Sequence, residues 1–439
     1  MQTVAASQSP ATVLDVGGRE AADTRAANWI QRYRAVRWQT DSLCEPLVSE
    51  DYVVQSMPDV SPTKWHLAHV TWFFETFLLS PHYAGYQPFD PHFAYLFNSY
   101  YVTVGDRHCR QNRGLLSRPT VADTYAYRKH VDGAMERFLS EAPHALLGNV
   151  EAIIEIGLHH EQQHQELMLT DIKHVFWVNP LRPAYRPEAT GEAGVRTPMR
   201  WIGFDGGLNF VGHEGHGFAF DNERPRHRTF VEPFQLASRL VTNGEYRKFI
   251  EDGGYRRADL WLSMGWATVQ RESWDAPLYW IHQDGQWLNH TLQGLRAVRD
   301  EEPVCHVSYF EADAYARWAG ARLPSEFEWE IASRSVPIEG NFVETGLHHP
   351  RQLSRDSESI SQMFGDVWEW TRSAYLAYPG YQPPAGALGE YNGKFMCNQF
   401  VLRGGSCATP RSHVRPTYRN FFPPDARWQF SGFRLARDG

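Results

Sequence analysis

The pattern of apolar residues changes near residue 180, and this change limits the chain to a fold in two parts. Before that point, apolar residues recur at helical spacing in four long segments, at about 24–43, 61–79, 120–140 and 149–178. Four amphipathic segments separated by loops predict a four-helix bundle. After that point come short apolar runs, many glycines, and two clear helical segments at 242–251 and 309–319. The second part is therefore predicted to be an α+β domain with much irregular structure.

The segment 181–198 separates the two parts and is rich in proline, glycine and polar residues. We predict that it is a linker between a helical domain over residues 24–180 and an α+β domain over residues 199–439. Residues 1–23 are small, polar and mixed in charge, so we predict a disordered N-terminal tail there.

Composition excludes several classes of function. The net charge is -8 and no basic stretch stands out, so we expect no nucleic-acid partner. No apolar run reaches the roughly 18 residues of a membrane span, so no membrane partner is expected either. The N-terminus lacks a secretory signal pattern, and the five cysteines are sparse and without CxxC spacing. These features predict reduced thiols in a cytoplasmic protein.

Histidines in two helical segments predict a metal site. His160 and His164 lie four residues apart in the string HEQQHQE, so both rings lie on one face of the predicted helix. A third ligand is expected from the segment 61–79, where His69 shares a face with bulky apolar residues and His66 is rotated away from it. Facing helices of a bundle bring such ligands together in the core. Asp171 continues the face of His164 and is a possible acceptor behind the ligands.

The same string matches the HExxH motif of zinc hydrolases, in which Glu161 would be the general base. No extension of that motif with a third histidine follows it. Three neutral imidazoles suit zinc, iron, copper or nickel about equally, so the ligands alone do not name the metal.

A wider combination of motifs is more specific. The chain has WHLAH at 65–69, HEQQHQE at 160–166, RGGS at 403–406 and RPTYRNFFPPDARWQFSGFRLAR at 415–437. This combination resembles the ergothioneine-pathway sulfoxide synthases, also called hercynine oxygenases, over nearly the whole chain. The resemblance implies an α+β protein with a DinB-like four-helix bundle, followed by a C-type-lectin-like domain of the formylglycine-generating-enzyme type.

The resemblance also implies an activity. Iron(II) would be held by His69, His160 and His164, and O2 would be the co-substrate of oxidative C–S bond formation. The substrates would be hercynine, which is trimethylhistidine, and a thiol, either cysteine or γ-glutamylcysteine, with cysteine favoured. The product would be a sulfoxide. Copper-dependent formylglycine-generating enzymes share the C-terminal landmarks, but they use two cysteines after RGGS, and only Cys407 lies there in this chain.

The family pattern extends to the substrate-binding residues. Gln163 would face the hercynine carboxylate, and Arg110 and Arg113 would bind the carboxylate of the thiol substrate. A quaternary ammonium cannot donate a strong hydrogen bond, so it needs aromatic faces or acceptor oxygens. The residues matching that part of the family pattern are Asn420, Phe421 and Phe422.

A proton donor is also expected. Some family members supply a tyrosine shortly before RGGS, but the stretch 398–403 contains none. Tyr100 and Tyr101 are the alternative that we favour jointly, because a phenol near the iron could donate a proton.

Three other functions stay open at this level. An ovothiol-type enzyme would join cysteine to histidine itself, although such proteins usually carry a methyltransferase domain that is not visible here. A zinc hydrolase would use Glu161, and a binding module would have no activity. We further predict that the site lies between the two domains, with Arg110, Gln163 and Phe421 close to the histidines.

Overall fold

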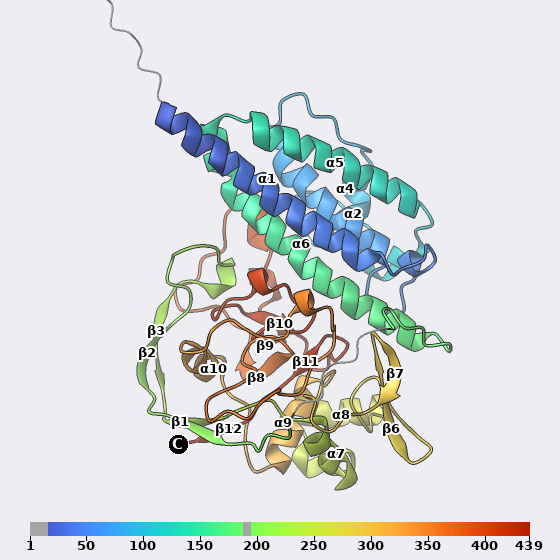
Figure 1. Cartoon of the computed structure of the whole chain (residues 1–439), viewed down its shortest axis with the longest axis vertical. Coiled ribbons are helices and arrows are strands. Elements are labelled where there is room, and N and C mark those ends of the chain that lie inside the picture. Colours follow the sequence, from blue (N-terminus) through green and yellow to red (C-terminus); the bar gives the residue numbers. More distant parts are fainter. Residues whose placement is uncertain (1–15, 188–194) are drawn as a thin grey trace, which may run out of the picture.

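The computed structural model describes residues 16–187 and 195–439, and the two parts of the sequence form two packed domains (Figure 1). The N-terminal domain is a bundle of four long helices: α1 (Val16–Cys44), α2 (Thr63–Phe74), α5 (Val121–Glu141) and α6 (His144–Val178). Helices α1 and α2 each pack against both α5 and α6. Short helices α3 (Ser80–His82) and α4 (Phe93–Phe97) lie between α2 and α5. The bundle predicted from apolar spacing is confirmed.

Two boundaries differ from the sequence prediction. Helix α1 begins at Val16, so the tail predicted to reach residue 23 ends earlier, and residues 1–15 lie outside the described part of the chain. Arg19, Glu20, Ala21 and Ala22 favour a helix in this stretch, although Gly17 and Gly18 do not. The segment predicted as a linker is partly docked. The backbone N–H groups of Tyr185 and Arg186 donate to the carbonyl of Leu292 at 2.8 and 2.9 Å. Its residues 188–194 are outside the described chain.

The start of α2 also differs. A serine followed by proline is a common start of a helix, so Ser61 is the expected cap, but the cap position belongs to Pro62 and the helix starts at Thr63. The Ser61 hydroxyl instead accepts a hydrogen bond from Arg113 at 2.9 Å. Its backbone N–H donates to Asp171 at 2.8 Å. Ser61 therefore ties three segments of the bundle together at one end.

The C-terminal domain contains four small sheets and four longer helices. One sheet has the order β1 (Trp201–Phe204), β4 (Phe234–Ala237), β12 (Ala436–Asp438), and another has β10 (Asn420–Phe422), β9 (Phe400–Arg403), β8 (Trp368–Ala374), β11 (Ser431–Gly432). The hairpin of β2 (Gly207–Val211) with β3 (His227–Val231) and the sheet of β5 (Trp280–Gln283), β6 (Gln286–Thr291) and β7 (Gly294–Ala297) complete the set. The helices are α7 (Asn243–Glu251), α8 (Ser263–Glu272), α9 (Tyr309–Trp318) and α10 (Glu326–Ser333).

Helices α7 and α9 confirm the two helical segments predicted in this part, whereas α8 and α10 were not predicted. Helix α10 begins with a capping box, in which Ser325 and Glu328 bond each other's backbone N–H. Its other glutamates look like surface residues in the sequence. Glu326 is instead buried, with Arg403 at 2.9 Å and Arg419 at 2.8 Å. Because the buried face of this helix carries charged residues, the pattern of apolar residues in the sequence does not indicate it.

Helix α6 lies along the boundary between the bundle and the C-terminal domain (Figure 1). On its bundle side, the Glu161 carboxylate is fully buried and meets Arg37 at 2.9 Å. On its other side, Glu166 accepts hydrogen bonds from Trp368 at 2.8 Å and from Ser406 at 2.6 Å. No helix in the described ranges is long and apolar enough to cross a membrane.

We predict that Glu161→Gln lowers the free energy of unfolding by about 3–5 kcal/mol, because it removes the fully buried carboxylate shared by Arg37 and Arg128 and leaves them only the partly exposed Asp132 and Asp41. Glu155→Gln on the same helix is the control, since its pair with Arg32 is partly exposed and contributes about 0–1 kcal/mol. Denaturant titration measures both variants.

The same pair makes a pH-dependent prediction. Burial alone would raise the pKa of Glu161, but Arg37 and Arg128 hold it below its ordinary value. The stabilisation by ionised Glu161 is therefore present above the unfolded pKa and is lost as the pH falls through the folded one. The difference in the free energy of unfolding between wild type and Glu161→Gln should become smaller at acidic pH. A difference that stays constant with pH, or a loss as small as that of Glu155→Gln, would contradict the assignment.

Candidate metal centre and substrate cavity

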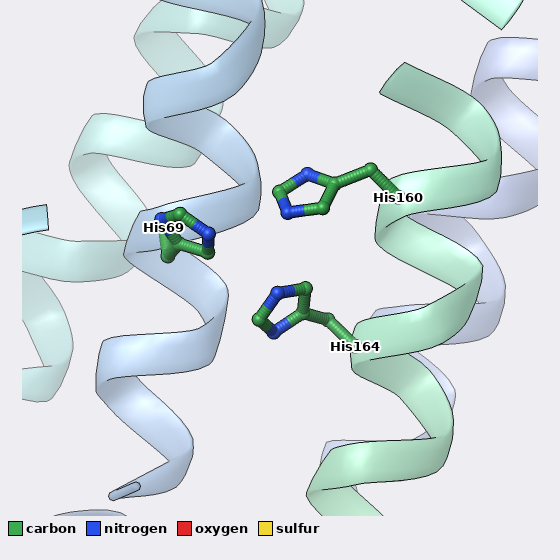
Figure 2. A group of neighbouring side chains, drawn as sticks. All are labelled: His69, His160 and His164. Carbon is green, nitrogen blue, oxygen red and sulfur yellow. The ribbon is translucent and has the colours of Figure 1, made fainter. Parts of the chain in front are cut away.

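Three histidine rings converge between two helices, as Figure 2 shows. His69 comes from α2, and His160 and His164 come from successive turns of α6. One nitrogen from each ring lies within 4.8 Å of the other two, and all three side chains are buried. The ring centroids are 4.7 to 4.9 Å apart. The structure therefore brings together the three residues that the sequence proposed as ligands.

A hydrogen bond to a backbone carbonyl determines which ring nitrogen of His69 is unprotonated. Its Nδ1–H donates to the carbonyl of Phe97 at 2.5 Å, so Nε2 carries the lone pair. That Nε2 is buried and has no hydrogen-bond partner within the described residues. Burial and the neighbouring His160 hold the pKa of His69 well below its ordinary value, so the ring is neutral.

Two successive hydrogen bonds determine which ring nitrogen of His164 is unprotonated. The Asp171 carboxylate accepts from Nε2–H of His66 at 2.9 Å. This leaves Nδ1 of His66 without a proton, and it accepts from Nδ1–H of His164 at 2.8 Å. His164 consequently turns an unprotonated Nε2 toward the other rings. Asp171 thus acts behind the ligands as the sequence suggested, but through His66.

His160 completes the set. Both of its ring nitrogens are buried and have no hydrogen-bond partner in the part of the chain that the structure describes. Burial lowers its pKa to about 3. Unpaired polar atoms in a protein interior are destabilising, so such a cluster calls for a ligand. Three neutral imidazoles with free lone pairs fit a divalent transition metal, and three protein ligands leave positions open for substrates.

Glu161 does not fit the role of general base in a hydrolase. It points into the bundle, where Arg37 at 2.9 Å, Arg128 at 3.4 Å and the Thr40 hydroxyl at 2.7 Å surround its carboxylate. These partners hold it ionised and engage both oxygens. In this chain the glutamate of the HExxH match therefore has a structural role, and its two histidines are the candidate metal ligands His160 and His164.

His160 and His164 line a cavity of about 710 Å³ between the two domains. This volume lies in the usual range for small-molecule sites. All of the bundle and sheet residues proposed for substrate binding line it: Arg110, Arg113, Gln163, Asn420, Phe421 and Phe422. Each wall comes from a different domain, so the cavity exists only where the two domains meet.

Arg113 is the distinctive charge of the bundle wall. It is 3% exposed, and its guanidinium lies 3.3 Å above the centre of the Trp65 ring. Its terminal nitrogens donate to the hydroxyls of Ser61 at 2.9 Å and Ser99 at 3.2 Å. No carboxylate pairs with it in the described chain, and burial lowers its pKa to about 8. Arg110 is exposed at the same wall and donates to the carbonyl of Asp59.

The opposite wall is aromatic. Phe421 lies on β10, with its ring stacked 4.1 Å from that of Tyr375 and 6.0 Å from that of Phe395. Phe422 packs edge-on against Trp428 at 5.8 Å. Pairing of β10 with β9 fixes the position of these residues in the cavity wall.

Tyr391 is a cavity residue that sequence reasoning missed. Its ring centre is 5.8 Å from that of His160, and its hydroxyl donates to Oε1 of Gln163. Tyr391 lies upstream of the stretch 398–403 in which the family pattern places a tyrosine. A wider window before RGGS would have found it.

The two tyrosines favoured from the sequence lie at different depths. Tyr100 lines the cavity, with its ring 6.2 Å from that of Tyr391. Tyr101 is fully buried behind it and packs against Trp72 at 5.6 Å and Phe77 at 5.1 Å. The cavity lining therefore includes Tyr100 but not Tyr101.

Comparison with known proteins matches both domains. The DinB superfamily matches residues 32–168, and the sulfatase-modifying factor enzyme 1-like domain matches residues 188–354 and 350–439. Hercynine oxygenase of Mycolicibacterium thermoresistibile is 34% identical over 87% of this chain and 88% of its own length. That of Mycobacterium tuberculosis is 32% identical over 87% and 92%.

The chain belongs to the hercynine oxygenase family. It is therefore an oxygenase that combines a DinB-type bundle with a domain of the formylglycine-generating-enzyme type. The formylglycine-generating enzyme of Streptomyces coelicolor is 28% identical over 58% of this chain and 92% of its own length. Cys407 is buried and unpaired here, and no second cysteine follows it in the sequence.

We predict that His66→Leu or Asp171→Asn weakens metal binding about 10- to 100-fold, because each removes the support that orients His164. His160→Ala should abolish binding by removing a ligand. His130→Leu is the control, since this histidine of α5 is exposed. Competition with a chelator after anaerobic loading measures the affinities. Wild-type metal affinity in His66→Leu would show that the hydrogen bonds from Asp171 through His66 do not orient His164.

Proposed function

We propose that this protein uses iron(II) and O2 to join hercynine to a thiol, cysteine or γ-glutamylcysteine, as a sulfoxide in ergothioneine biosynthesis. One observation carries the proposal. Three neutral, buried imidazoles with free lone pairs lie beside a cavity that has a buried, unpaired arginine on one wall and stacked aromatic rings on the other. The relatives are named hercynine oxygenases, which supports an oxygenase that acts on hercynine.

The iron would be held by His69, His160 and His164. When bound, it would supply electrons for the reduction of O2 and would keep the thiol deprotonated at neutral pH. Zinc could keep the thiol deprotonated but could not reduce O2. The three ligands are neutral in the folded protein, so no proton has to leave them at neutral pH.

Hercynine has a carboxylate, a trimethylammonium group and an imidazole. We assign the carboxylate to Gln163, whose amide can donate to it. We assign the trimethylammonium to Phe421 and Phe422, with Asn420 as a nearby oxygen donor, because a quaternary cation is attracted to aromatic faces. This leaves the imidazole directed toward His160 and His164.

The thiol substrate also carries a carboxylate, which we assign to Arg113, with Arg110 closer to solvent. A buried guanidinium offers a fork of N–H donors that matches a carboxylate. A carboxylate bound there would also offset the burial that lowers the pKa of Arg113. Cysteine and γ-glutamylcysteine both meet this requirement.

A proton is needed as O2 is reduced, and we assign its donation to Tyr391, supported by Tyr100. Burial raises the pKa of both phenols, so each keeps its proton at neutral pH. Tyr391 is the closer group, because its ring lies against His160. We assign a packing role to Tyr101.

The other candidate functions have less support. The hydrolase lacks a free base, since Glu161 is paired with arginines. The ovothiol-type reaction would attack a different ring carbon, and the relatives named above favour hercynine. A cytoplasmic location is supported by five cysteines that are all free, including exposed Cys109 and Cys397.

The decisive experiment mixes anaerobic, iron(II)-loaded protein with hercynine and each thiol, and then admits O2. The expected product is a sulfoxide with sulfur at C2 of the imidazole, identified by mass spectrometry and NMR. Sulfur on another carbon would favour the ovothiol-type reaction. Full activity with zinc and no O2 would favour hydrolysis.

We predict that Arg113→Met raises the KM for the thiol about 10- to 100-fold, since it removes charge-assisted hydrogen bonds, and leaves the KM for hercynine near its wild-type value. Arg113→Lys should fall between, because lysine keeps the charge but not the planar fork. Arg118→Met is the control for loss of one exposed charge. Equal effects of Arg113→Met on both substrates would refute the assignment.

A further inference from the structure

A row of hydrogen bonds leads from Gln163 away from the cavity and into the C-terminal domain. Nε2 of Gln163 donates to the Tyr418 hydroxyl at 2.7 Å, and that hydroxyl lies 3.0 Å from Nε2 of His413. Nδ1 of His413 lies 2.9 Å from Nδ1 of His159. In the other direction, the Tyr391 hydroxyl donates to Oε1 of Gln163. The row joins cavity side chains to a histidine that is 1% exposed and does not line the cavity.

The proton positions in this row determine one another. Because the Tyr418 oxygen accepts from Gln163, its single proton is directed to Nε2 of His413. In this direction of the row that nitrogen is unprotonated, so His413 carries its proton on Nδ1 and donates it to His159. Burial, together with His159 and Arg415, holds the pKa of His413 well below its ordinary value. One neutral tautomer of His413 therefore satisfies every contact.

The direction of the row decides which end of the Gln163 amide is available. An amide nitrogen has two hydrogens, and Tyr418 takes one of them, which leaves the second for a substrate. A flipped amide would turn its oxygen toward Tyr418 and would need a proton from that hydroxyl. With Nδ1 of His413 protonated, Nε2 already accepts this proton, so the amide can flip only if the tautomers of His413 and His159 switch with it.

We propose that His413 is a positioning residue that acts through Tyr418 to make Gln163 offer an N–H to the carboxylate of the imidazole substrate. The inference rests on the proposed function, in which this carboxylate meets Gln163. A carboxylate only accepts hydrogen bonds, so the orientation of the amide decides between attraction and repulsion. His413 itself touches no substrate.

Two substitutions at His413 separate this role from simple packing. In His413→Gln, the amide head reaches the position of Nε2 and can accept from Tyr418. In His413→Asn, it reaches only the position of Nδ1, so His159 keeps a partner and Tyr418 loses its acceptor. Tyr418→Phe removes the linking hydroxyl and leaves both histidines in place.

The readout is binding of two ligands that differ in one group: hercynine and its decarboxylated analogue, trimethylhistamine. We expect His413→Asn and Tyr418→Phe to raise the Kd for hercynine about 10-fold, the effect of losing a hydrogen bond to a charged group. His413→Gln should bind hercynine almost as wild type does. The Kd for the analogue and the KM for the thiol should not change. Anaerobic calorimetry of the iron-loaded protein measures both Kd values, and steady-state assays measure the KM.

Two results would overturn the inference: an unchanged Kd for hercynine in His413→Asn, or equal weakening of both ligands. Thermal denaturation checks that each variant is folded, and Tyr418→Phe carries the comparison if His413→Asn is not. Wild-type protein that does not turn hercynine over would overturn the proposed function, and this inference with it. If wild type and His413→Asn both bind hercynine more tightly than the analogue, and by the same ratio of Kd values, the inference is wrong but the proposed function is not.

Discussion

The structure depends on the burial of helix α6 on two opposite sides. On one side the carboxylate of Glu161 is held by arginines of the bundle, and on the other Glu166 is held by the indole and hydroxyls of the C-terminal domain. A helix fixed on both sides cannot rotate about its axis. His160 directly precedes the first of these glutamates and His164 lies two residues before the second, so the same contacts that join the domains also orient the candidate ligands.

Burial then decides the protonation of the site. The imidazoles are neutral because a charged ring would be poorly solvated there, and each neutral ring has one donor and one acceptor nitrogen. A partner for one nitrogen therefore assigns the other. The carbonyl of Phe97 assigns His69, and Asp171 assigns His164 through His66. The row from His413 to Gln163 follows the same rule on the other wall, where tautomers determine the direction of an amide.

The two domains contribute different chemistry to one cavity. The bundle supplies the three histidines together with Arg110 and Arg113, whereas the C-terminal domain supplies most of the aromatic rings. The domain of the formylglycine-generating-enzyme type forms a wall of the site here, and Cys407 is the one cysteine after RGGS in the sequence. Because neither domain has the complete site, its geometry depends on how the two domains pack.

The sequence by itself predicted the bundle and the pair His160 and His164, because helical spacing places residues four apart on one face whatever surrounds them. His69 was predicted from its inward face, and the residues of the cavity walls were predicted from the resemblance to a known family. Only the tertiary structure decided that Glu161 faces arginines, that His66 links Asp171 to His164, and that Tyr391 lies against His160. It also showed α10 as a helix with buried charges. These features depend on partners far apart in the chain, and local periodicity carries no information about which distant residue will supply a counter-charge or a hydrogen bond.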